Sequence, residues 1–86
     1  MTRTKVEVSL KEGLDTRTIA MLVQMASQYE STVYIEHDEK HVNAKSIMGM
    51  MTLALQNGDQ VEVVTEGKDE EKAAEGIGLY LTGKAS

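Results

Sequence analysis

Apolar and polar residues alternate along residues 5–10, KVEVSL, where Val6, Val8 and Leu10 fall on one side of an extended chain. A period of two is the pattern of a strand with one buried face, so this segment predicts the first strand. Three later segments have the same character and predict three more strands: residues 31–36, 41–44 and 60–65. Strands with one apolar and one polar face are typical of an antiparallel sheet that helices cover on one side.

The spacing of apolar residues changes after the first strand. Ile19, Leu22, Val23 and Ala26 recur at the positions i, i+3, i+4 and i+7 of an amphipathic helix, which we expect to end near Tyr29. The polar residues between these positions leave the opposite side of the helix to solvent.

Two further segments predict helices. Residues 46–55, SIMGMMTLAL, are too long and too rich in methionine for a strand, and we expect this helix to end before Asn57 and Gly58. The last helix should begin at Asp69, a natural N-cap that acidic residues follow in the first turn. Its apolar face consists of Ala73, Ala74, Ile77, Tyr80 and Leu81.

The predicted order is strand, helix, strand, strand, helix, strand, helix. It indicates the α+β class, with a four-stranded antiparallel sheet and three helices on one face. No repeat, linker or low-complexity segment interrupts the 86 residues. We therefore expect residues 1–86 to form a single domain.

Composition and charge narrow the classes of function. The chain is 41% hydrophobic and 27% charged, as in ordinary soluble domains, and its lack of cysteine removes disulfides and thiolate metal ligands. A net charge of −5 repels a phosphate backbone, so direct nucleic-acid binding is not expected. No apolar run suits a signal peptide or a membrane span, which favours the cytoplasm. The core of so short a chain is thin, so multi-step catalysis on a large substrate is not expected. We expect no enzyme activity and no cofactor.

Ser46 stands directly before the apolar run of the second predicted helix. Its hydroxyl suits an N-cap, and a phosphate on it would meet the same backbone N–H groups. That phosphate would add charge beside Ile47, Met48 and Met51. These three side chains would be core residues by spacing alone, but the run is apolar nearly all round. Some of it should therefore be exposed as a contact surface for a protein partner.

Residues 12–20, EGLDTRTIA, lie where the first helix should begin. They combine a glycine turn at Glu12 and Gly13 with Arg17 and two threonines. This combination at the start of a helix is typical of a phosphate-binding loop. Asp15, which is not a usual phosphate-accepting residue, stands at the centre of this loop.

Taken together, the sequence resembles HPr, the phosphocarrier protein of the bacterial sugar phosphotransferase system. The resemblance spans nearly the whole chain and rests on the element order, the Gly13 turn, VNAKSIMGMM at residues 42–51, the NGD turn and the acidic start of the last helix. KSIMG is typical of Gram-positive members. The loop of this family carries a phosphorylated histidine, then arginine and proline. Here Asp15 replaces the histidine and Thr18 replaces the proline, while Arg17 is kept.

Loss of the histidine with retention of the serine segment resembles the Crh subgroup, the catabolite-repression HPr-like proteins of bacilli. Members of that subgroup commonly carry glutamine at the histidine position and keep the arginine–proline pair, so the loop here departs from both patterns. The resemblance implies an HPr-like open-faced sandwich, βαββαβα. It also implies that exchange of the first strand between two copies can produce a homodimer.

The resemblance further implies regulation at Ser46. HPr kinase/phosphorylase would phosphorylate this serine, and the phosphoprotein would bind CcpA, a LacI-type repressor, as corepressor in carbon catabolite repression. DNA would be reached only through the repressor. The positions that would contact the repressor are Arg17, Ile47, Met48 and Met51. Lys45 would dock the kinase or neutralise the phosphate, unless it is only a solvated lysine.

Asp15 leaves three interpretations open. As a plain cap it would only begin the helix; paired with Arg17, it would also imitate the negative charge of the phosphorylated carrier. As a phosphocarrier it would form an acyl phosphate, which normally needs magnesium and several acidic ligands, and only Glu12 lies near in sequence. The altered loop also suits an interaction module that regulates a metabolic enzyme.

His37 and His41 flank the hairpin HDEKH and are the only histidines in the sequence. The acidic residues beside them would suit a metal ion, but solvated turn chemistry is the commoner meaning of such a segment, and we expect no metal site.

Overall fold

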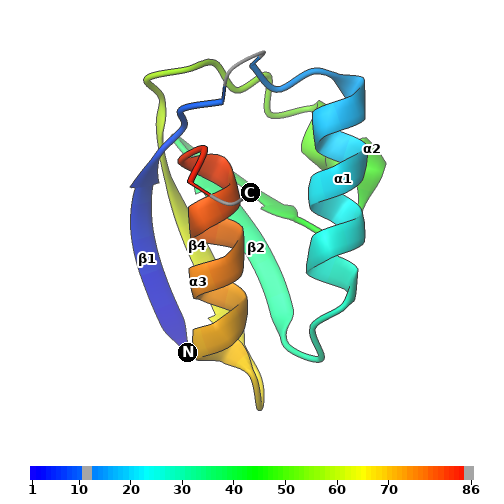
Figure 1. Ribbon diagram of the computed structural model, residues 1–86, viewed down its shortest axis with the longest axis vertical. Helices are drawn as coiled ribbons and strands as arrows, with labels where there is room; N and C mark the ends of the chain where they lie inside the picture. The colour runs from blue at the N-terminus through cyan, green and yellow to red at the C-terminus, as the bar shows by residue number, and fades with distance from the viewer. Residues whose placement is uncertain (11–12, 85–86) are drawn as a thin grey trace.

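The structure of the protein, a computed structural model, describes residues 1–10 and 13–84. These residues form four strands and three helices in the predicted order (Figure 1). Their bounds are β1 Thr2–Glu7, α1 Thr16–Ser27, β2 Thr32–His37, β3 Lys40–Asn43, α2 Ile47–Met51, β4 Gln60–Glu66 and α3 Glu70–Leu81. No helix in this part of the chain is long and apolar enough to span a membrane.

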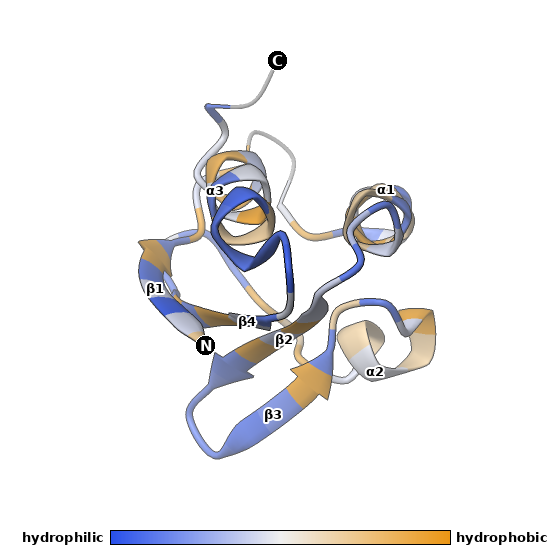
Figure 2. Ribbon diagram, turned by 90° about the horizontal axis from the view of Figure 1, so that it is seen from below, coloured by the Kyte–Doolittle hydropathy of each residue, from blue (hydrophilic) through white to orange (hydrophobic). Residues whose placement is uncertain are grey.

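The strands form one antiparallel sheet in the order β1-β4-β2-β3. All the described helices lie toward one face of this sheet, an open-faced sandwich as predicted (Figure 2). α3 packs on β1 and β4, whereas α1 and α2 lie side by side toward the other edge, where α2 contacts β3. The sheet therefore keeps one face in solvent, and α1 and α2 form one side of the molecule.

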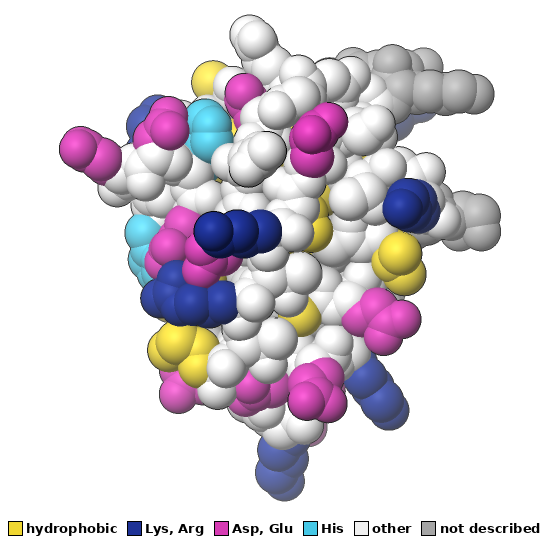
Figure 3. Space-filling model, turned by 90° about the vertical axis from the view of Figure 1, so that its left-hand side faces the viewer, with side chains coloured by type: hydrophobic (Ala, Val, Ile, Leu, Met, Phe, Trp, Pro, Cys, Tyr) yellow, Lys and Arg dark blue, Asp and Glu magenta, His cyan; other side chains and the backbone are white. Residues whose placement is uncertain are grey.

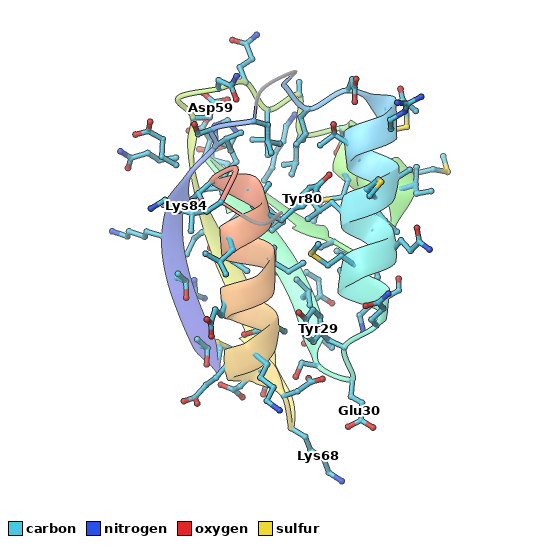
Figure 4. All side chains as sticks on the ribbon, viewed as in Figure 1. Tyr29, Glu30, Asp59, Lys68, Tyr80 and Lys84 are labelled. Atoms are coloured by element: carbon cyan, nitrogen blue, oxygen red, sulfur yellow. The ribbon has the colours of Figure 1, made fainter. Side chains whose placement is uncertain are left out.

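The core lies between the sheet and the helices. The predicted apolar face of α1 is buried there together with Val33, Ile35 and Val63, which are 0% exposed, whereas the apolar residues of β1 and β3 are half-buried. On α3, Tyr80 is half-buried and extends toward α1 (Figure 4), with its hydroxyl 3.5 Å from the Thr18 carbonyl. The apolar positions that the sequence periodicity identified therefore face the core between the sheet and the helices.

The first strand ends earlier than predicted. β1 stops at Glu7, which pairs with Gln60, the first residue of β4. Val8 has left the ladder but is 0% exposed, and its N–H donates to the Asp59 carbonyl at 2.8 Å. The predicted strand, residues 5–10, both starts and ends later than β1. It ends later because alternation reports burial, and burial continues after strand pairing has ended.

The second helix is also shorter than predicted, because α2 ends at Met51 instead of continuing to residue 55. Ala54 has a φ of 51°, which is incompatible with a right-handed helix. Leu53 and Leu55 are nevertheless 3% and 5% exposed, so both side chains reach the core from the loop. The prediction of a continuous helix was therefore wrong beyond Met51, where two leucines contribute to the core without helical backbone.

Asp69 precedes α3 as predicted, but its carboxylate does not cap that helix. It accepts hydrogen bonds from the backbone N–H of Glu30 at 3.0 Å and of Ser31 at 2.9 Å, and a further one from the Ser31 hydroxyl. The Ser31 hydroxyl and the two N–H groups stabilise the ionised carboxylate and lower the pKa of Asp69 to about 2. Asp69 therefore ties the α1–β2 turn to the start of α3.

Acid should weaken the fold through Asp69. Its folded pKa of about 2 lies below the unfolded value of 3.8, so the stabilisation is present above the unfolded pKa and is lost as the pH falls through the folded one. Urea unfolding at neutral pH and at about pH 3 should show this loss, and Asp69→Asn, which cannot ionise, should reduce it. The loss of stability that remains is assigned to the other carboxylates whose pKa is lowered by hydrogen bonds: Glu70, to about 2 through the Thr2 hydroxyl, Glu36 through His41, and Asp15 through the Thr18 N–H. An Asp69→Asn variant as acid-sensitive as the wild type would contradict the assignment.

Candidate functional site

Ser46 lies between the end of β3 and the first residue of α2. Its backbone is extended, with a φ of −112° and a ψ of 116°, and its Oγ accepts a hydrogen bond from the backbone N–H of Gly49 at 3.1 Å. The predicted N-cap is confirmed by this geometry. The residue is half-buried and stands directly before the exposed Ile47 at the start of α2.

The apolar side chains of α2 divide between the core and the surface. Met48 is 81% exposed, Met51 52% and Ile47 46%, whereas Met50 is 0% exposed. The three exposed side chains lie on one side of the short helix, at positions i, i+1 and i+4. We refer to Ile47, Met48 and Met51 as the apolar surface of α2. The prediction that part of the run is exposed is confirmed.

Two residues of the neighbouring helix α1 are exposed on the side opposite its buried face. Arg17 is exposed, and Met21, one helical turn further on, is 52% exposed. Sequence reasoning found Arg17 through the family resemblance but missed Met21. The signal was present, because a methionine lies among the polar positions of an amphipathic helix.

Lys45 makes a structural contact that sequence reasoning did not predict. Its Nζ donates a 2.8 Å hydrogen bond to the carbonyl of Tyr29, just beyond the end of α1. The negative end of the helix dipole favours a cation at this place. The side chain of Lys45 is half-buried in this position. The interpretation as a solvated lysine was therefore wrong. A role toward a kinase or a phosphate stays a prediction.

Asp15 is the N-cap of α1. Its Oδ1 accepts a 2.8 Å hydrogen bond from the backbone N–H of Thr18, and this bond lowers the pKa of Asp15; the nearby charge of Arg17 contributes less. The predicted cap is confirmed. Arg17 forms no ion pair with Asp15 within the described ranges, and the predicted turn residue Glu12 lies outside them.

The two histidines lie away from Ser46. The ring of His41 stacks on Tyr34 at a centroid distance of 4.4 Å, and its Nδ1 lies 2.8 Å from a carboxylate oxygen of Glu36. His37 Nε2 lies 3.7 Å from Asp59. Among residues 1–10 and 13–84, no group of histidine and acidic side chains is placed to hold a metal ion. These histidines therefore form part of a polar surface.

Other charges also gather on the open face of the sheet. Arg3 Nη1 lies 2.7 Å from Glu62 and 3.2 Å from Glu36, two carboxylates that directly oppose each other across β4 and β2. The side of the molecule seen in Figure 3 carries acidic, basic and histidine side chains, with apolar side chains only in small separate spots. The exposed methionines of α1 and α2 thus differ in character from this charged side.

The model of one protein family matches this chain. It is the model PTS-HPr, described as the PTS HPr component phosphorylation site, and it covers residues 2–82. The chain belongs to the HPr family. The HPr-like protein Crh of Bacillus subtilis strain 168 is 47% identical over 81 residues, which are 94% of this chain and 95% of Crh.

Solved structures of HPr proteins have the same fold. The phosphocarrier protein HPr of Bacillus anthracis gives a TM-score of 0.89 at 45% identity, covering 93% of this chain and 95% of that one. The crystal structure of Bacillus subtilis Crh gives 0.80 at 44% identity and covers 100% and 99%; it is described as a dimer with a swapped domain. The predicted family, its Crh-like character and the fold are therefore confirmed.

Proposed function

We propose that this chain is a regulatory HPr-like protein that lacks the phosphocarrier histidine. HPr kinase/phosphorylase phosphorylates it on Ser46, and the phosphoprotein acts as corepressor of the LacI-type regulator CcpA in carbon catabolite repression. The observation that carries the proposal is the position of Ser46, which caps α2 beside the exposed side chains of Ile47, Met48 and Met51. The similarity to Crh proteins supports the same role.

The geometry around Ser46 suits a two-part recognition. A phosphate there supplies about two negative charges and several acceptor oxygens for basic groups of the repressor. The apolar surface of α2 lies next to it and supplies the contact that excludes water. Arg17 and Met21 extend the contact over α1. Because the protein carries a net charge of −5, a basic partner surface is favoured, and DNA is reached through the repressor alone.

In this proposal the protein is not a catalyst, since its chemistry is carried out on Ser46 by another enzyme. Asp15 already accepts a hydrogen bond from the N–H of Thr18, so its carboxylate serves to begin α1. This supports the cap interpretation over a working phosphocarrier. The carboxylate of Asp15 also makes the surface of the loop negative at the position where the carrier has a histidine.

Intact mass after two separate incubations tests the proposal. The kinase with ATP should add one phosphate to the wild type and none to Ser46→Ala. Phosphoenolpyruvate with the phosphotransferase of the sugar system should add none to either, because an aspartate cannot form the phosphoramidate of the carrier. A phosphate from phosphoenolpyruvate that is present in Ser46→Ala and sensitive to hydroxylamine would instead identify Asp15 as a carrier.

Exchange of β1 between two copies is a second part of the proposal. Among the residues that the structure describes, β1 is an edge strand that pairs only with β4, and Arg3 and the Thr2 hydroxyl attach it to carboxylates of β2, β4 and α3. All these contacts can form equally well with a second chain, so exchange costs little. Size measurement of fresh and aged samples over a range of concentrations should reveal a dimer. A protein that stays monomeric throughout would exclude the exchange.

A further inference from the structure

The methionines of this protein differ widely in their access to solvent. The exposed fraction is 81% for Met48, 68% for Met1, which lies outside α1 and α2, 52% for both Met21 and Met51, and 0% for Met50, while Met25 is half-buried. The sequence contains six methionines but no cysteine and no tryptophan. Thioethers are therefore the side chains of this chain that an oxidant attacks most readily, and no thiol in the chain competes with them.

We propose that Met48, together with Met51 and Met21, is a reversible oxidation site that controls partner binding. The oxidant is hydrogen peroxide. Its O–O bond breaks, one oxygen forms a bond to the methionine sulfur, and the other leaves as water, so the sulfur loses two electrons and becomes a sulfoxide. A sulfoxide reductase reverses the step when its dithiol supplies two electrons and two protons and the oxygen leaves as water. The effect on binding rests on the function proposed above.

The position of Met48 makes oxidation a local event. Its side chain projects from the outer side of α2, so a peroxide reaches the sulfur without any unfolding. Met50, in the same helix, is buried in the core and so is protected from the peroxide. The core packing of α2 is therefore kept while the exposed methionines are oxidised. Oxidation should therefore alter the surface of α2 without altering its position.

The chemical consequence falls on the apolar contact. A sulfoxide is polar and chiral, and burying it against an apolar partner surface leaves an acceptor oxygen without a hydrogen bond. Two of the three side chains in the apolar surface of α2 are methionines, and a third methionine lies on α1. Phosphate on Ser46 promotes binding, and oxygen on the neighbouring Met48 opposes it. The same surface would thus respond both to the kinase and to peroxide.

Peptide mapping by mass spectrometry tests the oxidation site without any partner. The folded protein is treated with limiting hydrogen peroxide, and the oxygen added at each methionine is followed with time. We expect Met48 to be oxidised first within α2 and Met50 last, with unchanged circular dichroism. Equal rates at Met48 and Met50 in the folded protein, or unfolding that accompanies oxidation, would overturn the proposed site.

Repressor binding by the Ser46 phosphoprotein tests the consequence. Peroxide treatment should weaken binding about tenfold or more, and methionine sulfoxide reductase should restore it. The control is the triple variant Met21→Leu, Met48→Leu and Met51→Leu. Its treated and untreated forms should bind the repressor equally, whatever the affinity of the variant itself. Equal binding by treated and untreated wild type would refute the switch and leave the proposed function standing. No binding by the untreated phosphoprotein would refute the proposed function, and the switch with it.

Discussion

Met50→Ala is expected to destabilise the protein by about 2–4 kcal/mol, whereas Met48→Ala should change the free energy of unfolding by less than about 0.5 kcal/mol. Both substitutions remove the same atoms from the same helix. Met50 is 0% exposed and packs in the core, so its truncation leaves a cavity, while Met48 is 81% exposed and leaves none. Urea unfolding followed by circular dichroism measures both values.

Binding should give the opposite order for the same pair. Met48→Ala removes the most exposed member of the apolar surface of α2 and should weaken repressor binding by the phosphoprotein about tenfold. Met50→Ala should bind normally at temperatures where it remains folded. If Met48→Ala lost stability as Met50→Ala does, or if it bound as the wild type does, the division of α2 into a core side and a contact side would be wrong.

Periodicity predicted the strands and helices because it reports one-sided burial directly. The buried positions of α1, including Ile19 and Leu22, were all identified from spacing alone. The boundaries were less accurate, since Val8 and Leu55 are buried outside regular elements. An apolar residue looks the same in sequence whether it reaches the core from a helix or from a loop.

The candidate site was predicted in part. Ser46 and Asp15 were identified as caps because capping depends on the next few residues of the chain. By contrast, the hydrogen bond that Lys45 donates to Tyr29 and those that Asp69 accepts from the Ser31 turn join segments that are distant in sequence. No local pattern encodes such contacts.

The orientation of α2 was beyond the reach of sequence reasoning for a related reason. A helix of five residues has no long apolar stripe to fix its rotation, so composition indicated that some side chains are exposed without saying which. Packing against α1 and β3 decides that Met50 points inward and Met48 outward. The functional surface is therefore a property of the tertiary structure, although all its residues are adjacent in sequence.

Ser46→Ala and Ser46→Asn should both lose phosphate-dependent repressor binding, about 100-fold or more, but should differ in stability. The serine has two separable roles: its Oγ accepts the N–H of Gly49, and in the proposed function it accepts the phosphate. Alanine removes both roles and should cost about 1 kcal/mol of stability. Asparagine is as good an N-cap as serine and should cost only a few tenths of a kcal/mol, yet it cannot be phosphorylated in place of the hydroxyl.

The asparagine variant therefore separates loss of the phosphate from loss of the cap. Both variants and the wild type are treated with the kinase and ATP, their unfolding in urea is compared, and their affinity for the repressor is measured by calorimetry. If only Ser46→Ala lost binding, the hydroxyl would matter for the start of α2 and not as a phosphate acceptor. Loss in both variants, with stability reduced only in Ser46→Ala, would assign the regulatory role to the phosphate itself, because Ser46→Asn keeps the helix and the apolar surface of α2 in place.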